Sequence, residues 1–243
     1  MAIRLPVAML FLAFLAAQAS GANYTADFNS ATLDTGLSAV TLGGGGLVSG
    51  VAAPWSIASG GGYLTIAKSI TNTPNNDVIG VDTNFAIAGS FVATVTVDWS
   101  GNTNGWGGFY MGSNAGASGF GFGTNGLWDS VFGFPGGGDS GVAPTPVMTF
   151  QISRTGNTLT KSYKRDGDSS FTVLSSLTGN MVLGNAYIEL DNSSNIEPGT
   201  SLRFSNFSVQ TPVPEPEEYS LLLAGLGGLA LARRRLRRQA RPA

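Results

Sequence analysis

Acidic side chains are the main candidates for acid–base chemistry in this sequence, because the chain contains no His and no Cys. Their absence excludes a Ser-His-Asp triad, a thiolate nucleophile, a disulfide and a zinc site of the usual nitrogen and sulfur type. Glu189 and Asp191 stand two residues apart in an alternating run, so on a strand they would share one face. Two carboxyls facing a glycosidic bond are the groups that glycan hydrolysis requires. The simpler interpretation, which we favour, is a pair of polar residues at the end of a strand.

One acidic segment, Asp166-Gly167-Asp168, could supply oxygen ligands to a calcium ion. No Glu stands at the twelfth position of an EF-hand loop that would begin there, so a hairpin turn is the better interpretation. The sequence therefore predicts no cofactor. A calcium ion held by loop carbonyls and other Asp side chains stays open, and no metal ligands are assigned.

Aromatic residues and glycines gather between residues 101 and 142, a stretch that holds fifteen of the 35 Gly of the chain. Sugar rings are often bound by stacking on flat aromatic faces, which makes this stretch a candidate carbohydrate-binding surface. The residues selected for this role are Trp106, Tyr110 and Trp128. The alternative, favoured by short alternating runs around these residues, is that the aromatics belong to the core and the glycines to turns.

Charge is distributed unevenly along the chain. The whole sequence has net charge −2, but residues 22–211 contain six basic and twelve acidic residues, a net charge of −6. Nucleic-acid binding depends on Lys and Arg side chains that neutralise phosphates. An acidic body therefore argues against a nucleic-acid partner.

The body of the chain alternates between polar and apolar residues with the period of β-strands. In the run from Phe91 to Asp98, Phe91, Val95 and Val97 fall on one face and threonines on the other. Turn signals such as Gly156-Asn157 and Asp166-Gly167 separate these runs and predict tight hairpins. Many strands, short turns and hardly any helical periodicity predict an all-β fold of two antiparallel sheets packed as a sandwich.

The order of these strands resembles the concanavalin-like, or laminin-G-like, jelly roll. The resemblance rests on the opening run Tyr24–Phe28, the hairpin runs around Gly156 and Gly167, and the closing run Leu202–Val209. It implies that the first and last strands pair at one edge. Several glycosidases of this fold use a Glu-x-Asp-x-Glu run. Here Glu189-Leu190-Asp191-Asn192-Ser193 lacks the third acid, and a hydrolase would have to combine Glu189 with Asp191 or Asp98, since the next Glu, Glu197, lies in a predicted loop.

The first 19 residues have the features of a secretory signal peptide. Arg4 precedes an apolar run from Val7 to Ala16, and Ala17-Gln18-Ala19 supplies small residues at the two positions that a signal peptidase reads. The apolar run is well short of the ~20 residues that span a bilayer. Cleavage after Ala19 and export are therefore expected.

The last 31 residues combine a proline-stiffened motif, an apolar run from Tyr219 to Ala232 and a basic end. The motif consists of Val213, Pro214, Glu215 and Pro216, and the basic residues that would stop transfer on the cytoplasmic side include Arg233, Arg234, Arg235, Arg237 and Arg238. This tail resembles the PEP-CTERM sorting signal of Gram-negative bacteria. The resemblance implies a transient membrane helix and processing by an exosortase near Pro214-Glu215-Pro216. A plain C-terminal membrane anchor is the alternative.

The sequence thus predicts a signal peptide at residues 1–19, a β-sandwich at 20–212 and a sorting signal at 213–243. We expect a protein that is first held in the inner membrane of a Gram-negative bacterium and then delivered to the cell envelope, the outer surface or the extracellular matrix. The favoured function is a non-enzymatic surface or matrix protein associated with exopolysaccharide. A carbohydrate-binding module and a glycan hydrolase are the alternatives.

Overall fold

The computed structural model describes residues 23–43, 46–49, 55–68, 78–100, 106–113, 116–123, 126–132, 137–179, 186–192 and 201–211. These residues belong to one compact unit, Asn23–Thr211. The predicted signal peptide and the predicted sorting signal lie outside the described residues, so both remain predictions. Within the described ranges, no helix has the length and apolar character that crossing a membrane requires.

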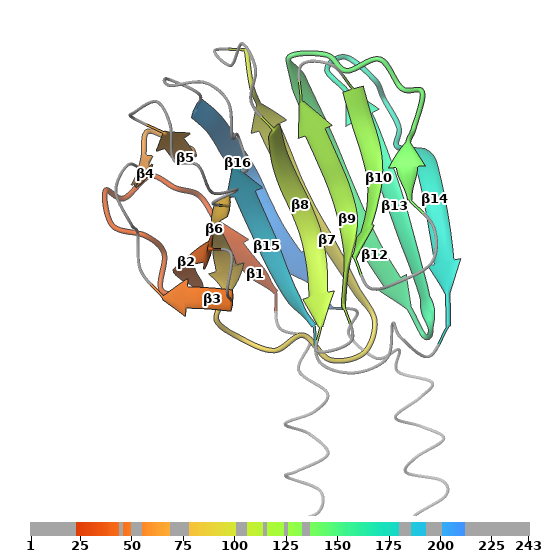
Figure 1. The fold of residues 1–243 in the computed structure, drawn as a ribbon, viewed down its shortest axis with the longest axis horizontal. Coiled ribbons are helices and arrows are strands. Elements are labelled where there is room, and N and C mark those ends of the chain that lie inside the picture. The colour runs from red at the N-terminus through yellow and green to blue at the C-terminus, as the bar shows by residue number, and fades with distance from the viewer. Residues whose placement is uncertain are drawn as a thin grey trace, which may run out of the picture. The chain divides into compact units, whose positions relative to one another are not determined.

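The described chain forms two antiparallel sheets (Figure 1). Sheet A has the order β14-β13-β12-β7-β16-β5-β4, and β1 also pairs with β16. Its strands are β1 (Tyr24–Ala26), β4 (Trp55–Gly60), β5 (Tyr63–Lys68), β7 (Phe91–Asp98), β12 (Val147–Thr155), β13 (Thr158–Arg165), β14 (Thr172–Thr178) and β16 (Ser201–Gln210). The first and last strands pair as predicted, through Tyr24 and Val209. However, β16 lies inside the sheet, between β7 on one side and β5 on the other.

Sheet B has the order β11-β10-β9-β8-β15-β6-β2-β3. Its strands are β2 (Leu37–Gly43), β3 (Gly46–Ser49), β6 (Val78–Thr83), β8 (Trp106–Ser113), β9 (Gly116–Gly123), β10 (Gly126–Phe132), β11 (Gly138–Asp139) and β15 (Tyr187–Asn192). Within the glycine-rich stretch, residues 106–113, 116–123 and 126–132 form strands, as the short alternating runs there predicted, but several glycines expected in turns lie inside these strands. The all-β, two-sheet prediction is confirmed.

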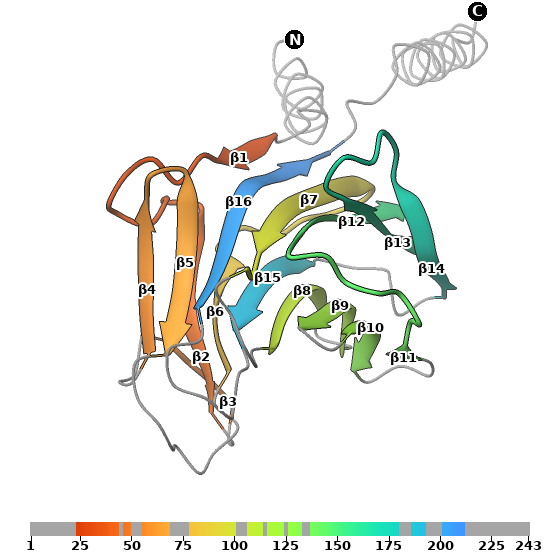
Figure 2. The same ribbon diagram turned by 90° about the horizontal axis from the view of Figure 1, so that it is seen from above.

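The two sheets lie face to face in the view from above (Figure 2), and buried side chains of both sheets form the hydrophobic core. Strand β7 has the burial pattern predicted for a half-buried strand: Phe91, Val95 and Val97 are buried. Aromatic rings join the layers, since Phe122 of sheet B stacks on Phe150 of sheet A with ring centroids 5.1 Å apart. Figure 2 also shows that sheet B is bowed, with β15 and β8 set back between β3 and the β10–β11 side. The face of sheet B that points away from the core is therefore concave.

One predicted hairpin is confirmed and the other is longer than predicted. Thr155 pairs with Thr158, which leaves a two-residue turn in which Gly156 has a φ of 59°. After β13, the Asp168 carboxylate accepts a hydrogen bond from the Arg165 N–H at 3.0 Å and closes a turn, but β14 begins only at Thr172. Asp168 thus serves the turn, which fits the hairpin interpretation of Asp166-Gly167-Asp168.

Strand β16 shows a change of phase that its sequence pattern had concealed. Simple alternation places Phe204 and Phe207 on opposite faces, which suggested apolar residues on both sides of the strand. In the structure, the register shifts between Ser205 and Ser208, and Asn206 has a φ of 53°. This β-bulge adds a residue and inverts the phase of the strand. Phe204 and Phe207 are therefore both buried in the core.

A charged cluster crosses the core between the sheets. The Lys161 side chain on β13 is only 1% exposed, and its ammonium donates hydrogen bonds to Asp129 on β10 and, at 3.1 Å, to Ser118 on β9. Burial lowers the pKa of Lys161, while the hydrogen bond to Asp129 and its charge act in the opposite direction. This cluster joins sheet A to sheet B by a polar contact between the layers.

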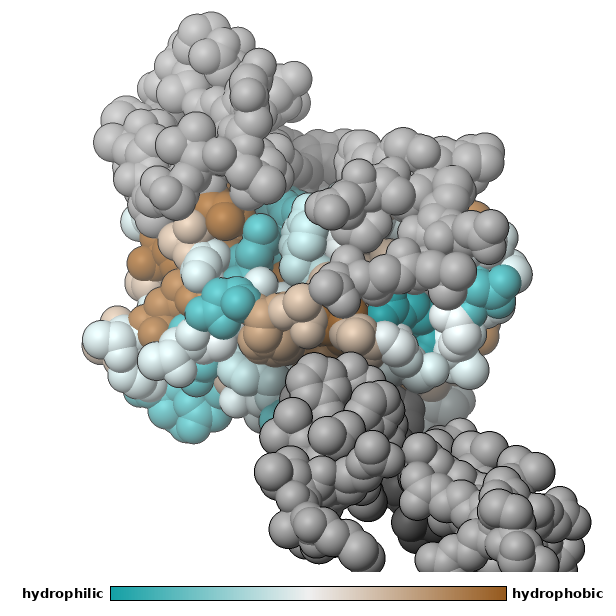
Figure 3. Space-filling view, turned by 90° about the horizontal axis from the view of Figure 1, so that it is seen from below, coloured by the Kyte–Doolittle hydropathy of each residue, from teal (hydrophilic) through white to brown (hydrophobic). Residues whose placement is uncertain are grey.

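The outer surface has few large apolar side chains. Among the described residues, the exposed large hydrophobic side chains are Tyr63 and Val173. Seen from below, the coloured surface of the described part is a mosaic of hydrophilic and hydrophobic residues (Figure 3).

Candidate functional site

The concave face of sheet B brings acidic, aromatic and glycine residues into register. On β8, Phe109 and Met111 point into the core, so Gly108 and Tyr110 lie on the opposite face. Strand pairing extends this face across the sheet in two neighbouring rows. The first row contains Ser38, Asp82, Glu189, Tyr110, Gly119 and Ser130. The second row contains Val40, Gly80, Asp191, Gly108, Gly121, Trp128 and Asp139.

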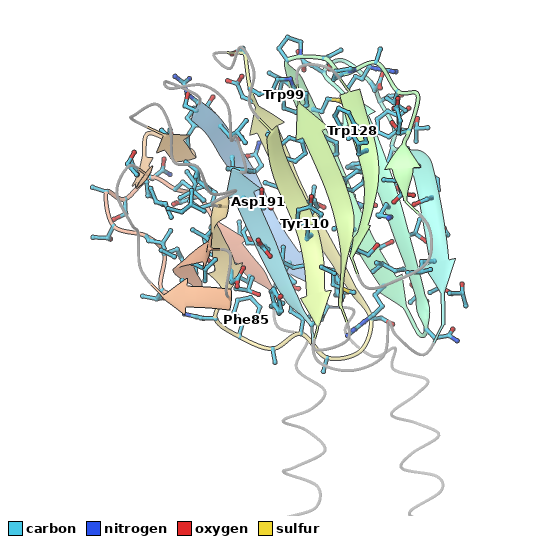
Figure 4. All side chains as sticks on the ribbon, in the orientation of Figure 1. Phe85, Trp99, Tyr110, Trp128 and Asp191 are labelled. Atoms are coloured by element: carbon cyan, nitrogen blue, oxygen red, sulfur yellow. The ribbon has the colours of Figure 1, made fainter. Side chains whose placement is uncertain are left out.

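Aromatic rings lie down on the glycines of this face. A β-carbon added at Gly108 would meet Tyr110 Cε2 at 1.9 Å, and one added at Gly126 would meet the Trp128 ring at 2.8 Å. A side chain at either glycine would therefore displace the ring, so glycine allows the aromatic rings to lie against the sheet. Figure 4 shows Tyr110 on β8 and Trp128 on β10, with Asp191 to one side on β15.

Three carboxyl groups gather at the β15–β6 end of these rows. Glu189 and Asp191 share the concave face of β15. Leu190, which lies between them, and Ile188, which precedes Glu189, are both buried in the core on the opposite face. Asp82 occupies the position on β6 that pairs directly with Glu189. Glu189 is 7% exposed and Asp191 is 4% exposed, whereas Asp82 is more accessible. The cluster thus lies in the floor of the concave face.

The surroundings of the three carboxyls disfavour their ionised forms. Burial raises the pKa of Glu189 to about 9, and the charges of Asp191 and then Asp82 add to the effect. Burial also raises the pKa of Asp82 to about 7. The pKa of Asp191 is raised by burial and by the charge of Asp82, although the backbone N–H of Gly108 stabilises its ionised form. Closely spaced, buried carboxyls with such shifts are typical of functional sites.

Two oxygens of the cluster are buried without a hydrogen bond. Within the described part of the chain, neither Asp82 Oδ1 nor Asp191 Oδ1 has a hydrogen-bond partner. A buried acceptor that lacks a donor costs about 1–3 kcal/mol. A buried acceptor of this kind in a native fold needs a specific explanation, such as a catalytic role, an ordered water or an ion.

The other predicted site residues are distributed as follows. Tyr110 is 9% exposed and Trp128 is half-buried, both on the concave face. Trp106 pairs with Gly123 at the start of β8, but its side chain lies outside the described atoms. Asp98 is on β7 of sheet A, where it pairs with Val147 and Arg203, so it belongs to a different sheet from Glu189. Glu197 lies outside the described residues.

No group of three or more acidic side chains in the described ranges has an arrangement that would hold a metal ion. A calcium ion held mainly by loop carbonyls, which the sequence leaves open, stays open.

Sequence reasoning missed Asp82, the partner of Glu189. The signal was present in Val78–Thr83, where Ile79 and Val81 are buried and Asp82 falls on the opposite face. The strand register that pairs Asp82 with Glu189 could not be predicted from the sequence, because the two residues are more than a hundred positions apart.

No protein-family model matches the chain, and no curated protein sequence matches it. Among solved structures, the chain is similar to the endo-β-1,3-glucanase from Pyrococcus furiosus, with a TM-score of 0.56, 13% identity and coverage of 77% of this chain and 93% of the other. It is similar to lectin II from Ulex europaeus, with a TM-score of 0.51, 11% identity and coverage of 78% and 97%. It is also similar to a GH43 protein from Bacillus licheniformis, with a TM-score of 0.56, 13% identity and coverage of 77% and 39%.

The fold is a concanavalin-like jelly-roll sandwich. At these identities the likeness shows the fold alone, and the chain spans well under half of the GH43 protein's length. The finding nevertheless corrects one prediction. The sequence analysis expected a non-enzymatic protein, partly because the third acid of the glycosidase run is missing. That expectation is wrong, because glycoside hydrolases are among the proteins that share this fold.

Proposed function

We propose that the concave face of sheet B binds a glycan and hydrolyses a glycosidic bond. The observation that carries this proposal is the pairing of Asp82 with Glu189 on that face, with Asp191 beside them and the rings of Tyr110 and Trp128 along the same rows. Carboxyl pairs perform this chemistry, and aromatic faces bind sugar rings. The lectin and the hydrolases of this fold support a carbohydrate ligand.

The different surroundings of the two paired carboxyls suggest their roles. Glu189, with its pKa raised to about 9, stays protonated at neutral pH and donates a proton to the leaving oxygen. Asp82 ionises more readily and is more accessible, so it attacks the anomeric carbon and forms a glycosyl ester that water then hydrolyses. Asp191 helps to keep Glu189 protonated through its charge.

Substitution of Glu189 tests this proposal. Directly paired residues have β-carbons about 4.5–5.5 Å apart. Retaining glycosidases have their two carboxyl groups about 5 Å apart, a spacing that neighbouring β-carbons allow, so we expect a hydrolysis product to keep the anomeric configuration of the substrate. We expect Glu189→Gln to reduce reducing-end release from a soluble polysaccharide panel by about 100-fold or more. The control is Asp98→Asn on sheet A, which should leave the rate unchanged. Absence of turnover on every polysaccharide, or equal loss in the control, would contradict the proposal.

We also propose that residues 213–243 deliver the protein to the cell surface as an exosortase substrate, as the sequence predicts. Proline-stiffened backbone around Pro214-Glu215-Pro216 suits an extended segment in a processing enzyme. The mass of the mature C-terminus from surface-enriched host material tests this. We expect the Arg-rich end to be missing, and replacement of the three motif residues by alanine should restore it. Mature protein that still ends in the arginines would overturn the proposal.

A further inference from the structure

The charges of the body are divided between the two sheets. All six basic residues between positions 22 and 211 lie on strands of sheet A, whereas sheet B strands carry five acidic residues and no basic one. The basic residues are Lys68, Arg154, Lys161, Lys164, Arg165 and Arg203. The acidic residues of sheet B are Asp82, Asp129, Asp139, Glu189 and Asp191. The only described ammonium that reaches sheet B, that of Lys161, is paired with Asp129 between the layers.

The strands that flank the acidic cluster provide no positive charge to it. On the β2 side, the neighbouring positions of the concave face are Ser38 and Val40. On the β8 side they are Gly108, Tyr110 and Gly112, and on β15 itself Tyr187. Burial raises the pKa of Tyr187, and the charges of Glu189 and then Asp82 add to the effect, so this phenol lies near the same group of acids.

The cluster has an unmet demand for hydrogen-bond donors. The Asp191 residue is only 4% exposed. Within the described ranges, neither its Oδ1 nor the Oδ1 of Asp82 has a hydrogen-bond partner. A calcium ion would need six to eight oxygen ligands, and the described acids do not form such a group. An ammonium group, in contrast, is a compact cation with three donors, which suits a few closely spaced carboxyl oxygens.

We propose that the concave face of sheet B selects a glycan carrying protonated amino groups, such as a polymer of hexosamine without N-acetyl groups. This inference rests on the proposed glycan-binding function and specifies its substrate class. The ammonium of one sugar unit pairs with Asp191 and Asp82, while an adjoining unit contacts the rings of Tyr110 and Trp128. The same face disfavours polyanionic glycans, because the sheet offers no Lys or Arg to neutralise a carboxylate or sulfate.

A matched pair of ligands tests the selectivity. The full chain is titrated calorimetrically at neutral pH and low salt with a glucosamine hexamer and with an N-acetylglucosamine hexamer of the same linkage. We expect the amine oligomer to bind at least about ten-fold more tightly, which corresponds to 1.4 kcal/mol. Because the free cluster holds protons that an ammonium would displace, its binding should also release protons, seen as a heat that changes with the ionisation enthalpy of the buffer. The acetylated oligomer should release none.

Two variants assign the effect to the cluster. Asp191→Asn and, separately, Asp82→Asn should remove most of the preference, whereas Asp98→Asn, which changes an acid on sheet A, should retain it. Equal or weaker binding of the amine oligomer, or a preference that survives both cluster variants, would overturn the inference. Hydrolysis of uncharged glycans without amine selectivity would overturn this inference and leave the proposed function intact. Selective binding of the amine oligomer without hydrolysis of any polysaccharide would support this inference and contradict the proposed hydrolysis.

Discussion

Replacing Lys161 by methionine should destabilise the sandwich by about 3–5 kcal/mol. The substitution keeps most of the volume of the side chain but removes the ammonium that bonds Asp129 and Ser118 across the core. Removal of one partner from a buried ion pair leaves the other charge without compensation, which is the costly case. Asp129 is 22% exposed, so water offsets part of this cost. Urea unfolding followed by tryptophan fluorescence measures the change.

Two further variants make the Lys161 prediction specific. Lys164→Met changes the same residue type on the same strand, but Lys164 contacts Phe171 at the surface, so it should cost less than about 1 kcal/mol. The double substitution Lys161→Met with Asp129→Leu removes both charges and should recover most of the loss. If Lys161→Met proved no more harmful than Lys164→Met, the inter-sheet ion pair would have no structural importance.

The folded protein should lose stability as pH rises from 5 to 8. A carboxyl whose pKa is raised by folding binds its proton more tightly in the folded state than in the unfolded chain. Its ionisation therefore destabilises the fold, and the penalty grows from the ordinary pKa, near 4, up to the folded value. For Asp82, whose pKa is raised to about 7, the interval between pH 5 and 7 corresponds to about 3 kcal/mol. Glu189 extends the decline toward pH 9.

Neutral variants should flatten this pH profile. Asp82→Asn removes one ionisable group and relieves the charge that raises the pKa of Glu189 and Asp191. At pH 8 the variant should therefore be more stable than the wild type, and the difference should shrink at pH 5. Asp139→Asn, on the same sheet but outside the cluster, serves as the control. Urea unfolding of all three proteins at pH 5, 6.5 and 8 gives the comparison. A wild-type profile that rises toward pH 8 would be inconsistent with protonated, buried carboxyls.

Much of the secondary structure could be predicted because local alternation reports burial directly. The buried set of β7 and the Gly156-Asn157 hairpin both follow from neighbouring residues in the sequence. The bulge at Asn206 could not be predicted in this way. It inverts the strand phase to place both Phe204 and Phe207 in the core, and that requirement comes from the opposing layer.

The candidate site was only partly visible. Glu189 and Asp191 share a face because they are two residues apart on one strand, and Tyr110 and Trp128 could be selected as aromatics among glycines. The sequence could not exclude Asp98 as the partner of Glu189, nor identify Asp82. Both questions depend on which sheet a strand joins and in which register.

The sequence by itself determined the strand-rich character of the body, the two faces of each regular strand, and the absence of basic residues from long stretches of the chain. Only the tertiary structure decided that the strands without Lys or Arg in sheet B lie together as one sheet, that Asp82 meets Glu189 on its concave face, and that Lys161 reaches Asp129 across the core. The physical reason is the range of the interactions. Alternation and turn chemistry act between neighbours in the chain, whereas strand register and inter-sheet contacts are fixed by packing between segments far apart in sequence.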